Sequence, residues 1–171
     1  TMIHNNLPKI FYFINEFDKD HIRKLDKKIS IIFRNYTIKP TKELIRNIKK
    51  FCKKDQRKFY LSNDVNLAIN LDLDGVYLPS FNKKLNLKKL SVKKAFLILG
   101  SAHSINEIKI KEEQGVQLIF LAPIFATQKN ISFLNPVRFN LLASKTNKKI
   151  IALGGINSKN ISKLKMTNSF G

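Results

Sequence analysis

The sequence predicts an α/β fold, a (β/α)₈ barrel of which about seven strand–helix units are present. Its short apolar runs are apolar almost throughout, which is typical of parallel strands covered on both faces. Helical patterns separate these runs, and polar residues gather just after them, where barrels place their active sites. No G-x-G-x-x-G follows the first run, which disfavours a dinucleotide-binding sheet. With 171 residues and 43% hydrophobic content, we expect one domain over residues 1–171.

Seven apolar runs are the predicted strands. In chain order they are KIFYFI (9–14), ISIIFR (29–34), KFYLS (58–62), GVYLP (75–79), AFLILGS (95–101), VQLIFLAP (116–123) and KIIALGG (149–155). A closed barrel of this class needs eight strands. We therefore expect the last strand and helix to be missing, with that strand starting where SFG (169–171) stops.

The intervening segments predict helices at 18–25, 41–54, 65–71, 104–115, 137–147 and 158–165. The segment 41–54 has the clearest apolar face, which includes Cys52, and Thr41 precedes it as a candidate N-cap. Ser104 and Glu107 have the spacing of a capping box, and Gly115 marks the end of that helix.

The composition limits the classes of partner. A net charge of +20 favours anionic partners, and we expect phosphorylated small molecules. The lysines are scattered and no nucleic-acid motif occurs, so we expect no nucleic acid. The single cysteine, Cys52, excludes an intrachain disulfide and a cysteine metal cluster. The apolar run at the N-terminus is too short for a signal peptide or a membrane span, so we expect a cytoplasmic protein without membrane contact. A homo-oligomer remains open.

Two glycines and a serine–histidine pair are candidates for anion binding. Gly154 and Gly155 separate a strand from a helix, where backbone N–H groups can approach a phosphate, or where the chain simply turns. Ser101 can donate to an anion, and His103 can transfer a proton. The spacing favours a structural role for His103 near a helix cap.

Charged residues at other strand ends raise further alternatives. Arg34 ends an apolar run, where it meets either an anion or an acidic partner. Asp64 stands at a strand end where a carboxylate can hold Mg²⁺, whereas Asp72 and Asp74 precede a strand and lie at the wrong end. The loop after the sixth run offers a hydroxyl, two amides and an ammonium, which suit a phosphate: Thr127, Gln128, Lys129 and Asn130.

Six stretches in this order resemble the thiamine phosphate synthase family, which also has a thiazole tautomerase branch. They are IIFRNY, LSNDVNLA, DGVYLPS, LGSAHS, LIFLAPIFATQKN and IIALGGI. The resemblance, to divergent bacterial members, implies a (β/α)₈ barrel. It also implies a transferase that joins hydroxymethylpyrimidine diphosphate to thiazole phosphate with Mg²⁺, giving thiamine phosphate and diphosphate.

The resemblance also implies roles on the diphosphate side. Arg34 matches the arginine of a Q-x-R-x-K strand end, while Ile32 and Tyr36 replace its glutamine and lysine. Ser62 stands at a diphosphate-binding asparagine, and Ser101 and Lys129 join this group. Three residues fall at or near metal-binding aspartates: Asn63, Asp64 and Asn82.

On the thiazole phosphate side the resemblance implies binding by Thr127, Gly154 and Gly155, with His103, Gln128 and Asn130 elsewhere in the pocket. Pro123 takes the place of the catalytic histidine of the tautomerase branch, so tautomerase chemistry is not expected. Thiamine phosphate synthesis is the leading function. The alternative is a non-catalytic member that binds a thiazole or thiamine phosphate as a ligand-binding or regulatory protein.

Overall fold

The computed structural model describes residues 7–125, 133–154, 156–167 and 169–171. Two compact units make up the chain, Thr1–Val76 and Tyr77–Gly171. Seven strands occur among the described residues, and they take sheet positions in chain order from β1 to β7. All seven predicted strands are confirmed, each to within two residues at either end, except that the predicted run 149–155 ends three residues beyond β7. The fold is α/β, as the apolar runs indicate.

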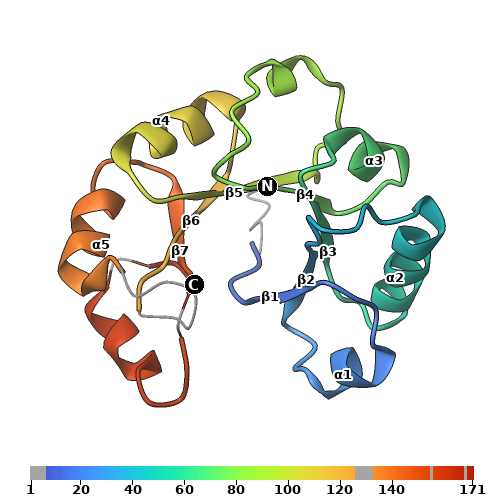
Figure 1. The fold of residues 1–171 in the computed structure, drawn as a ribbon, viewed down its shortest axis with the longest axis horizontal. Helices are drawn as coiled ribbons and strands as arrows, with labels where there is room; N and C mark the ends of the chain where they lie inside the picture. The colour runs from blue at the N-terminus through green and yellow to red at the C-terminus, as the bar shows by residue number, and fades with distance from the viewer. Residues whose placement is uncertain (1–6, 126–132, 155, 168) are drawn as a thin grey trace, which may run out of the picture. The chain divides into compact units, whose positions relative to one another are not determined.

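The first unit carries three parallel strands and three helices (Figure 1). They are β1 (Phe11–Ile14), α1 (Lys19–Lys24), β2 (Ser30–Phe33), α2 (Lys42–Lys54), β3 (Phe59–Ser62) and α3 (Val65–Asn70). The side chains of β2 and β3 are buried along their whole length, because neighbouring strands and helices cover both faces.

Helix α2 forms as its sequence pattern predicts. The Thr41 hydroxyl accepts a hydrogen bond from the Leu44 N–H at 3.1 Å, which confirms the predicted N-cap. Ile45, Ile48 and Cys52 are buried on its inner face. Burial raises the pKa of the Cys52 thiol to about 12, so this cysteine packs as a small apolar residue.

The second unit continues the alternation from β4 (Gly75–Leu78), which spans the boundary between the units. Its elements are η1 (Asn86–Lys89), β5 (Leu97–Ala102), α4 (Ile105–Gln114), β6 (Leu118–Leu121), α5 (Asn135–Ala143), β7 (Lys149–Ala152) and η2 (Ile161–Met166). Beyond η2 the chain returns to β7: Phe170 N–H donates to the Ile150 carbonyl and Ala152 N–H to that of Gly171, at 2.6 and 2.8 Å.

Two predicted helices differ from the structure. The expected helix at 158–165 is the 3₁₀-helix η2, which has no side-chain cap and covers a short segment, as 3₁₀-helices do. Helix α5 starts earlier than expected, because Pro136 fits its first turn. After β4, where the sequence predicts no helix, the chain forms the 3₁₀-helix η1.

The capping box of α4 is also wrong in one half. Glu107 N–H donates to the Ser104 hydroxyl at 3.3 Å, but the Glu107 carboxylate accepts from His103 N–H at 2.6 Å instead of from Ser104. The predicted stop is confirmed, since Gly115 caps the helix in the left-handed region with φ 86°. No helix in the described ranges is long and apolar enough to cross a membrane.

Candidate functional site

The carboxyl ends of β2 and β3 bring three predicted or neighbouring residues together within the first unit. Phe33 pairs with Leu61, so Arg34 and Ser62 are the next residues along the two parallel strands. Tyr36 follows β2 by three residues and returns to β3, where its hydroxyl lies 2.9 Å from the Ser62 hydroxyl. We call Arg34, Tyr36 and Ser62 the β2–β3 corner.

Arg34 is exposed and rests on an aromatic ring. Its guanidinium carbon lies 4.2 Å from the centre of the Phe13 ring, and its backbone N–H donates to the Ile14 carbonyl at 2.8 Å. Among the described residues, the guanidinium contacts this aromatic ring and forms no salt bridge with a carboxylate. The salt-bridge alternative for Arg34 therefore has no partner within the described part of the chain.

Asn35 fixes the loop that carries Tyr36. Its side-chain amide donates to the Asn15 carbonyl at 3.1 Å, which ties the loop after β2 to the end of β1. Its oxygen accepts from the N–H groups of Thr37 and Ile38 at 3.0 and 2.9 Å, an Asx-type turn. Sequence reasoning missed this role, although an asparagine just after a strand is a recognisable turn signal.

The environment of Tyr36 keeps its phenol protonated. Burial is the main cause that raises the pKa of Tyr36, and the Ser62 hydrogen bond and the Arg34 charge act against it. Ser62 is only 9% exposed, so the Tyr36 hydroxyl meets a buried partner at the end of β3, while 53% of Tyr36 as a whole is exposed. In the sequence, Tyr36 and Ser62 are two separate departures from the family pattern that the chain resembles, whereas in the structure a hydrogen bond joins them.

The residues expected to hold Mg²⁺ do not fit a metal site. The Asp64 carboxylate caps α3, where it accepts from the Leu67 N–H at 3.0 Å. In the second unit, the Asn82 side-chain oxygen accepts from the Lys84 N–H at 3.1 Å. Asn63 offers a neutral amide with φ 71°. No group of three His, Cys, Asp or Glu suited to a metal occurs among the described residues.

Asp74 lies at the amino end of β3, opposite to the carboxyl ends that carry the candidate site residues, as expected. Its carboxylate accepts from the Phe59 N–H at 2.9 Å and lies 3.7 Å from the Lys58 ammonium, at the amino end of β3. Asp74 therefore secures the start of a strand, and the sequence interpretation that set it apart from the strand-end residues agrees with this position.

In the second unit, Ser101 and His103 separate in role. Ser101 is buried within β5, opposite Phe120 of β6. His103 is exposed, and its ring Nδ1 lies 3.1 Å from the Glu107 carboxylate that also accepts its backbone N–H. These contacts place His103 directly before the N-cap of α4, in agreement with the structural interpretation of this histidine.

Gly154 lies where the chain leaves β7 and meets the chain leaving β6. Ile124 N–H donates to the Leu153 carbonyl at 2.9 Å, and Phe125 N–H to that of Gly154 at 3.2 Å. Gly154 has φ 95°, and a Cβ there would lie 2.8 Å from Pro123 Cβ. Only glycine suits both conditions. The remaining expected residues of this side lie outside the described residues: Thr127, Gln128, Lys129, Asn130 and Gly155.

A buried polar cluster below the loop after β4 was missed. Lys111 of α4 is fully buried, and its ammonium donates to the Asn82 carbonyl and the Gln114 side chain, both at 2.8 Å. Gln114 donates to the same Asn82 carbonyl at 2.8 Å. The signal was available: Ile108 and Lys111 share one face of the helix, and a glycine inside β5, Gly100, marks a close approach.

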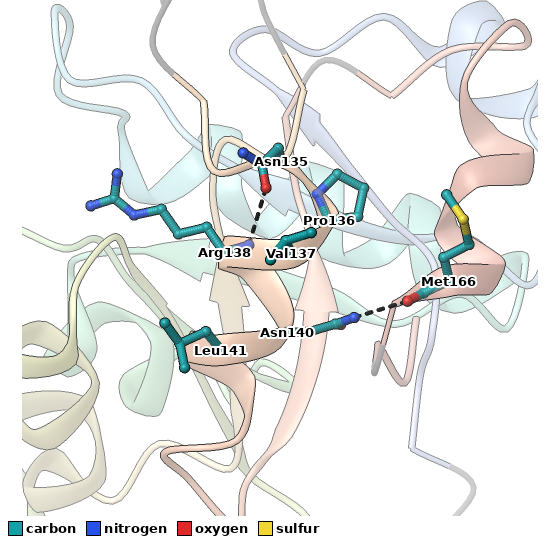
Figure 2. Close-up of a pocket in the computed structure, with 7 residues that line it drawn as sticks. All are labelled: Asn135, Pro136, Val137, Arg138, Asn140, Leu141 and Met166. Carbon is teal, nitrogen blue, oxygen red and sulfur yellow. Dashed lines mark hydrogen bonds between the residues drawn. The ribbon is translucent and has the colours of Figure 1, made fainter.

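A surface hollow of about 660 Å³ is lined by residues of α5 and η2 (Figure 2). Its exposed apolar walls include Val137, Leu141 and Met166. Asn140 spans it by donating to the Met166 carbonyl at 2.9 Å. Among the described residues that line it, Arg138 alone is titratable, so this lining offers little for catalysis.

The comparison with protein families decides where this fold belongs. A family model described as thiamine monophosphate synthase matches residues 24–170. The chain belongs to the thiamine monophosphate synthase family. A thiamine-phosphate synthase of Lysinibacillus sphaericus is 32% identical over 123 residues, which cover 69% of this chain and 57% of that protein. One of Prochlorococcus marinus is 30% identical over 131 residues, covering 74% and 38% respectively.

The family's fold appears among solved structures as well. A thiamine phosphate pyrophosphorylase from Pyrococcus furiosus superposes with a TM-score of 0.76 at 18% identity, covering 95% of this chain and 83% of that one. This similarity concerns the fold. The curated relatives are longer, since the matched part spans 38% of the Prochlorococcus protein and 57% of the Lysinibacillus protein.

Proposed function

We propose that this protein catalyses the thiamine phosphate synthase reaction, and membership of the family over residues 24–170 is the observation that carries this proposal. In that reaction the bond between the pyrimidine methylene carbon and the diphosphate oxygen breaks, and diphosphate leaves with the electron pair. The thiazole nitrogen then supplies its lone pair to the same carbon. No general base is needed, so the protein acts mainly by positioning and by stabilising the departing anion.

Two described residues are assigned to the two phosphorylated substrates. Arg34 is assigned to the diphosphate, because its guanidinium is exposed at a strand end and is held by the Phe13 ring. Gly154 is assigned to thiazole phosphate, because its backbone conformation brings the main chain close to the turn after β6. Ser101, His103 and the residues of 127–130 and 155 remain predictions as ligand contacts. Mg²⁺ is implied by the family, but we assign it no residue of this chain.

The direct test incubates the purified protein with both phosphorylated precursors and measures thiamine phosphate and diphosphate. Gly154→Ala should raise the KM for thiazole phosphate roughly tenfold, because displacing the main chain there should remove about one charge-assisted hydrogen bond to the phosphate. Gly115→Ala is the matched control, since it also forces alanine to a positive φ in the second unit, at the end of α4. It should leave the KM for thiazole phosphate unchanged. Equal KM values for both variants would contradict the assignment of Gly154.

A second candidate, ligand binding without turnover, is favoured by one observation. The carboxylate closest to the expected metal position, Asp64, is engaged as the N-cap of α3. Binding of thiamine phosphate measured by calorimetry, with no product formed from the two precursors at any Mg²⁺ concentration, would establish this function instead.

A further inference from the structure

We propose that the β2–β3 corner binds a phosphoryl group directly, through the Arg34 guanidinium and the Tyr36–Ser62 hydroxyl pair, without a bridging divalent cation. The proposal rests on the proposed function for the nature of the substrate. It assigns Tyr36 as a specificity-determining residue, a role that its place in the family pattern does not provide.

The corner supplies donors for an anion. Arg34 presents N–H groups from one face of the Phe13 ring, and its charge also reaches Tyr36. The two hydroxyls share one proton in their 2.9 Å hydrogen bond. When Tyr36 donates to Ser62, the Ser62 hydroxyl keeps its own proton for a ligand oxygen. One guanidinium and a hydroxyl thus face a phosphate oxygen from neighbouring strand ends.

The same corner is unsuited to a metal–phosphate complex. Mg²⁺ prefers carboxylate oxygens, and the nearby Asp64 carboxylate already accepts the Leu67 N–H in its helix cap. A guanidinium beside the hydroxyl pair repels a second cation, while it attracts an oxyanion. The protonated phenol adds no charge and, by donating to Ser62, leaves the Ser62 proton for the ligand. The chemistry of this donor set selects an uncomplexed phosphate or diphosphate.

The loop geometry makes the corner rigid before a ligand arrives. Asn35 ties the loop to Asn15 of the preceding connection and orders the next turn through Thr37 and Ile38. Tyr36 lies between these anchors, so its hydroxyl is held against the last residue of β3. A preorganised site loses less entropy on binding than a flexible loop does.

Calorimetric titration of the whole chain with inorganic diphosphate, in EDTA and again in Mg²⁺, tests the proposal. Diphosphate should bind in EDTA, and added Mg²⁺ should weaken the apparent affinity rather than strengthen it, because Mg²⁺ complexes the free anion in solution. Arg34→Ala should weaken binding by roughly tenfold or more, and Tyr36→Phe by roughly threefold to tenfold. Thermal unfolding of each variant verifies that it remains folded.

The first unit offers matched controls for both variants. Arg23→Ala removes another exposed arginine whose guanidinium lies over a ring, that of Phe51 at 5.3 Å. Tyr12→Phe removes a phenol that is hydrogen-bonded to the His21 ring at 2.9 Å. Both controls should bind diphosphate like the unmodified protein. Binding that requires Mg²⁺, absent binding, or equal losses in test and control variants would overturn the proposal.

Turnover separates this inference from the proposed function. Metal-independent diphosphate binding that depends on Arg34 and Tyr36, without product from the two precursors, supports the corner and rejects synthase activity. Product formation together with diphosphate binding that appears only with Mg²⁺ supports synthase activity and rejects the corner.

Discussion

Two buried cations, Arg57 in the first unit and Lys111 in the second, use their hydrogen-bond donors in different ways. Both lie in the interior, with 3% and 0% of their surfaces exposed, and both donate to backbone carbonyls instead of to a carboxylate. Arg57 reaches four carbonyls, whereas Lys111 reaches one carbonyl and one side-chain amide. The forked guanidinium distributes its charge over more acceptors than the ammonium can reach.

The two clusters also secure different kinds of structure. Arg57 bonds to carbonyls at the end of α1 and in the turn before β2, among them Ile22, Leu25, Asp26 and Ile29. The last carbonyls of a helix carry partial negative charge, which suits a cation there. Lys111 instead holds the loop after β4 through Asn82. The first cluster thus joins core elements, and the second fixes a loop that follows a strand.

The largest expected effect comes from Arg57→Met. It removes the shared donor of four carbonyls, one in a buried and three in part-buried hydrogen bonds, and we expect the free energy of unfolding to fall by roughly 3–5 kcal/mol. The matched change Lys111→Met should cost about 1 kcal/mol or less at pH 7, because Gln114 still donates to the Asn82 carbonyl. Urea unfolding of both variants measures the contrast. Similar losses in the two variants would remove the distinction.

The next effect is a pH dependence confined to the second cluster. Burial lowers the pKa of Lys111 to about 8; Glu107 opposes the shift, and Lys83 adds to it. Between pH 8 and about 10.5 the unfolded chain keeps a proton that the folded chain has lost, so the free energy of unfolding rises with pH. The rise attributable to Lys111 is roughly 3 kcal/mol in total.

Lys111→Met provides the control for this pH dependence. Other lysines also titrate in this range, so the measured quantity is the difference in unfolding free energy between the unmodified protein and Lys111→Met at each pH. That difference should change between pH 8 and 10.5 and stay constant from pH 6 to 7. A constant difference across the whole range would show that Lys111 keeps an ordinary pKa.

These clusters show where sequence reasoning succeeds and where it stops. The seven strands and the cap at Thr41 were predictable, because local patterns determine them: apolar runs, and a hydroxyl before an amphipathic segment. Arg57 was not singled out, because its partners are carbonyls 28 to 35 residues earlier, which no local pattern encodes. Lys111 lies on the buried face of α4, but a lysine is normally expected on the exposed face of a helix, so its burial was not predicted.

The candidate site divides along the same line. Arg34 and Ser62 were predictable as strand-end residues, because the carboxyl ends of parallel strands are the usual location of such sites. The Tyr36–Ser62 hydrogen bond was not, since it joins residues 26 apart through a loop shaped by Asn35. The metal expectation for Asp64 did not anticipate its use as a helix cap, although an aspartate just before a helix commonly serves that purpose.

A smaller effect tests how closely Lys111 is packed. A Cβ at Gly100 would lie 2.8 Å from Lys111 Cδ, 3.0 Å from a Val116 methyl and 3.2 Å from the Leu78 carbonyl oxygen. Gly100→Ala should therefore destabilise the protein by roughly 1–3 kcal/mol. Adding Lys111→Ala removes the nearest of the three contacts, so the double variant should lose less than the sum of the two single changes. Strict additivity would mean that Lys111 does not fill this space.

The smallest expected effect concerns the charged neighbours of Lys111, which alter its pKa. Lys83 is an exposed neighbour whose charge helps to lower the pKa of Lys111, while Glu107 on the same helix raises it. Lys83→Met removes only the repulsion, so the pH at which the unfolding free energy begins to rise should move upward. Glu107→Gln should move it downward, although this variant also loses the carboxylate that accepts the His103 N–H and so costs some stability at every pH. The direction of the pH shift separates the loss of the Glu107 charge from the loss of the hydrogen bond to His103. The lost hydrogen bond lowers the unfolding free energy equally at every pH, and so does not move the pH at which it begins to rise. Arg57 provides the reference, since neither change should alter the loss caused by Arg57→Met. Shifts in the same direction for both variants would show that the titration belongs to a group other than Lys111.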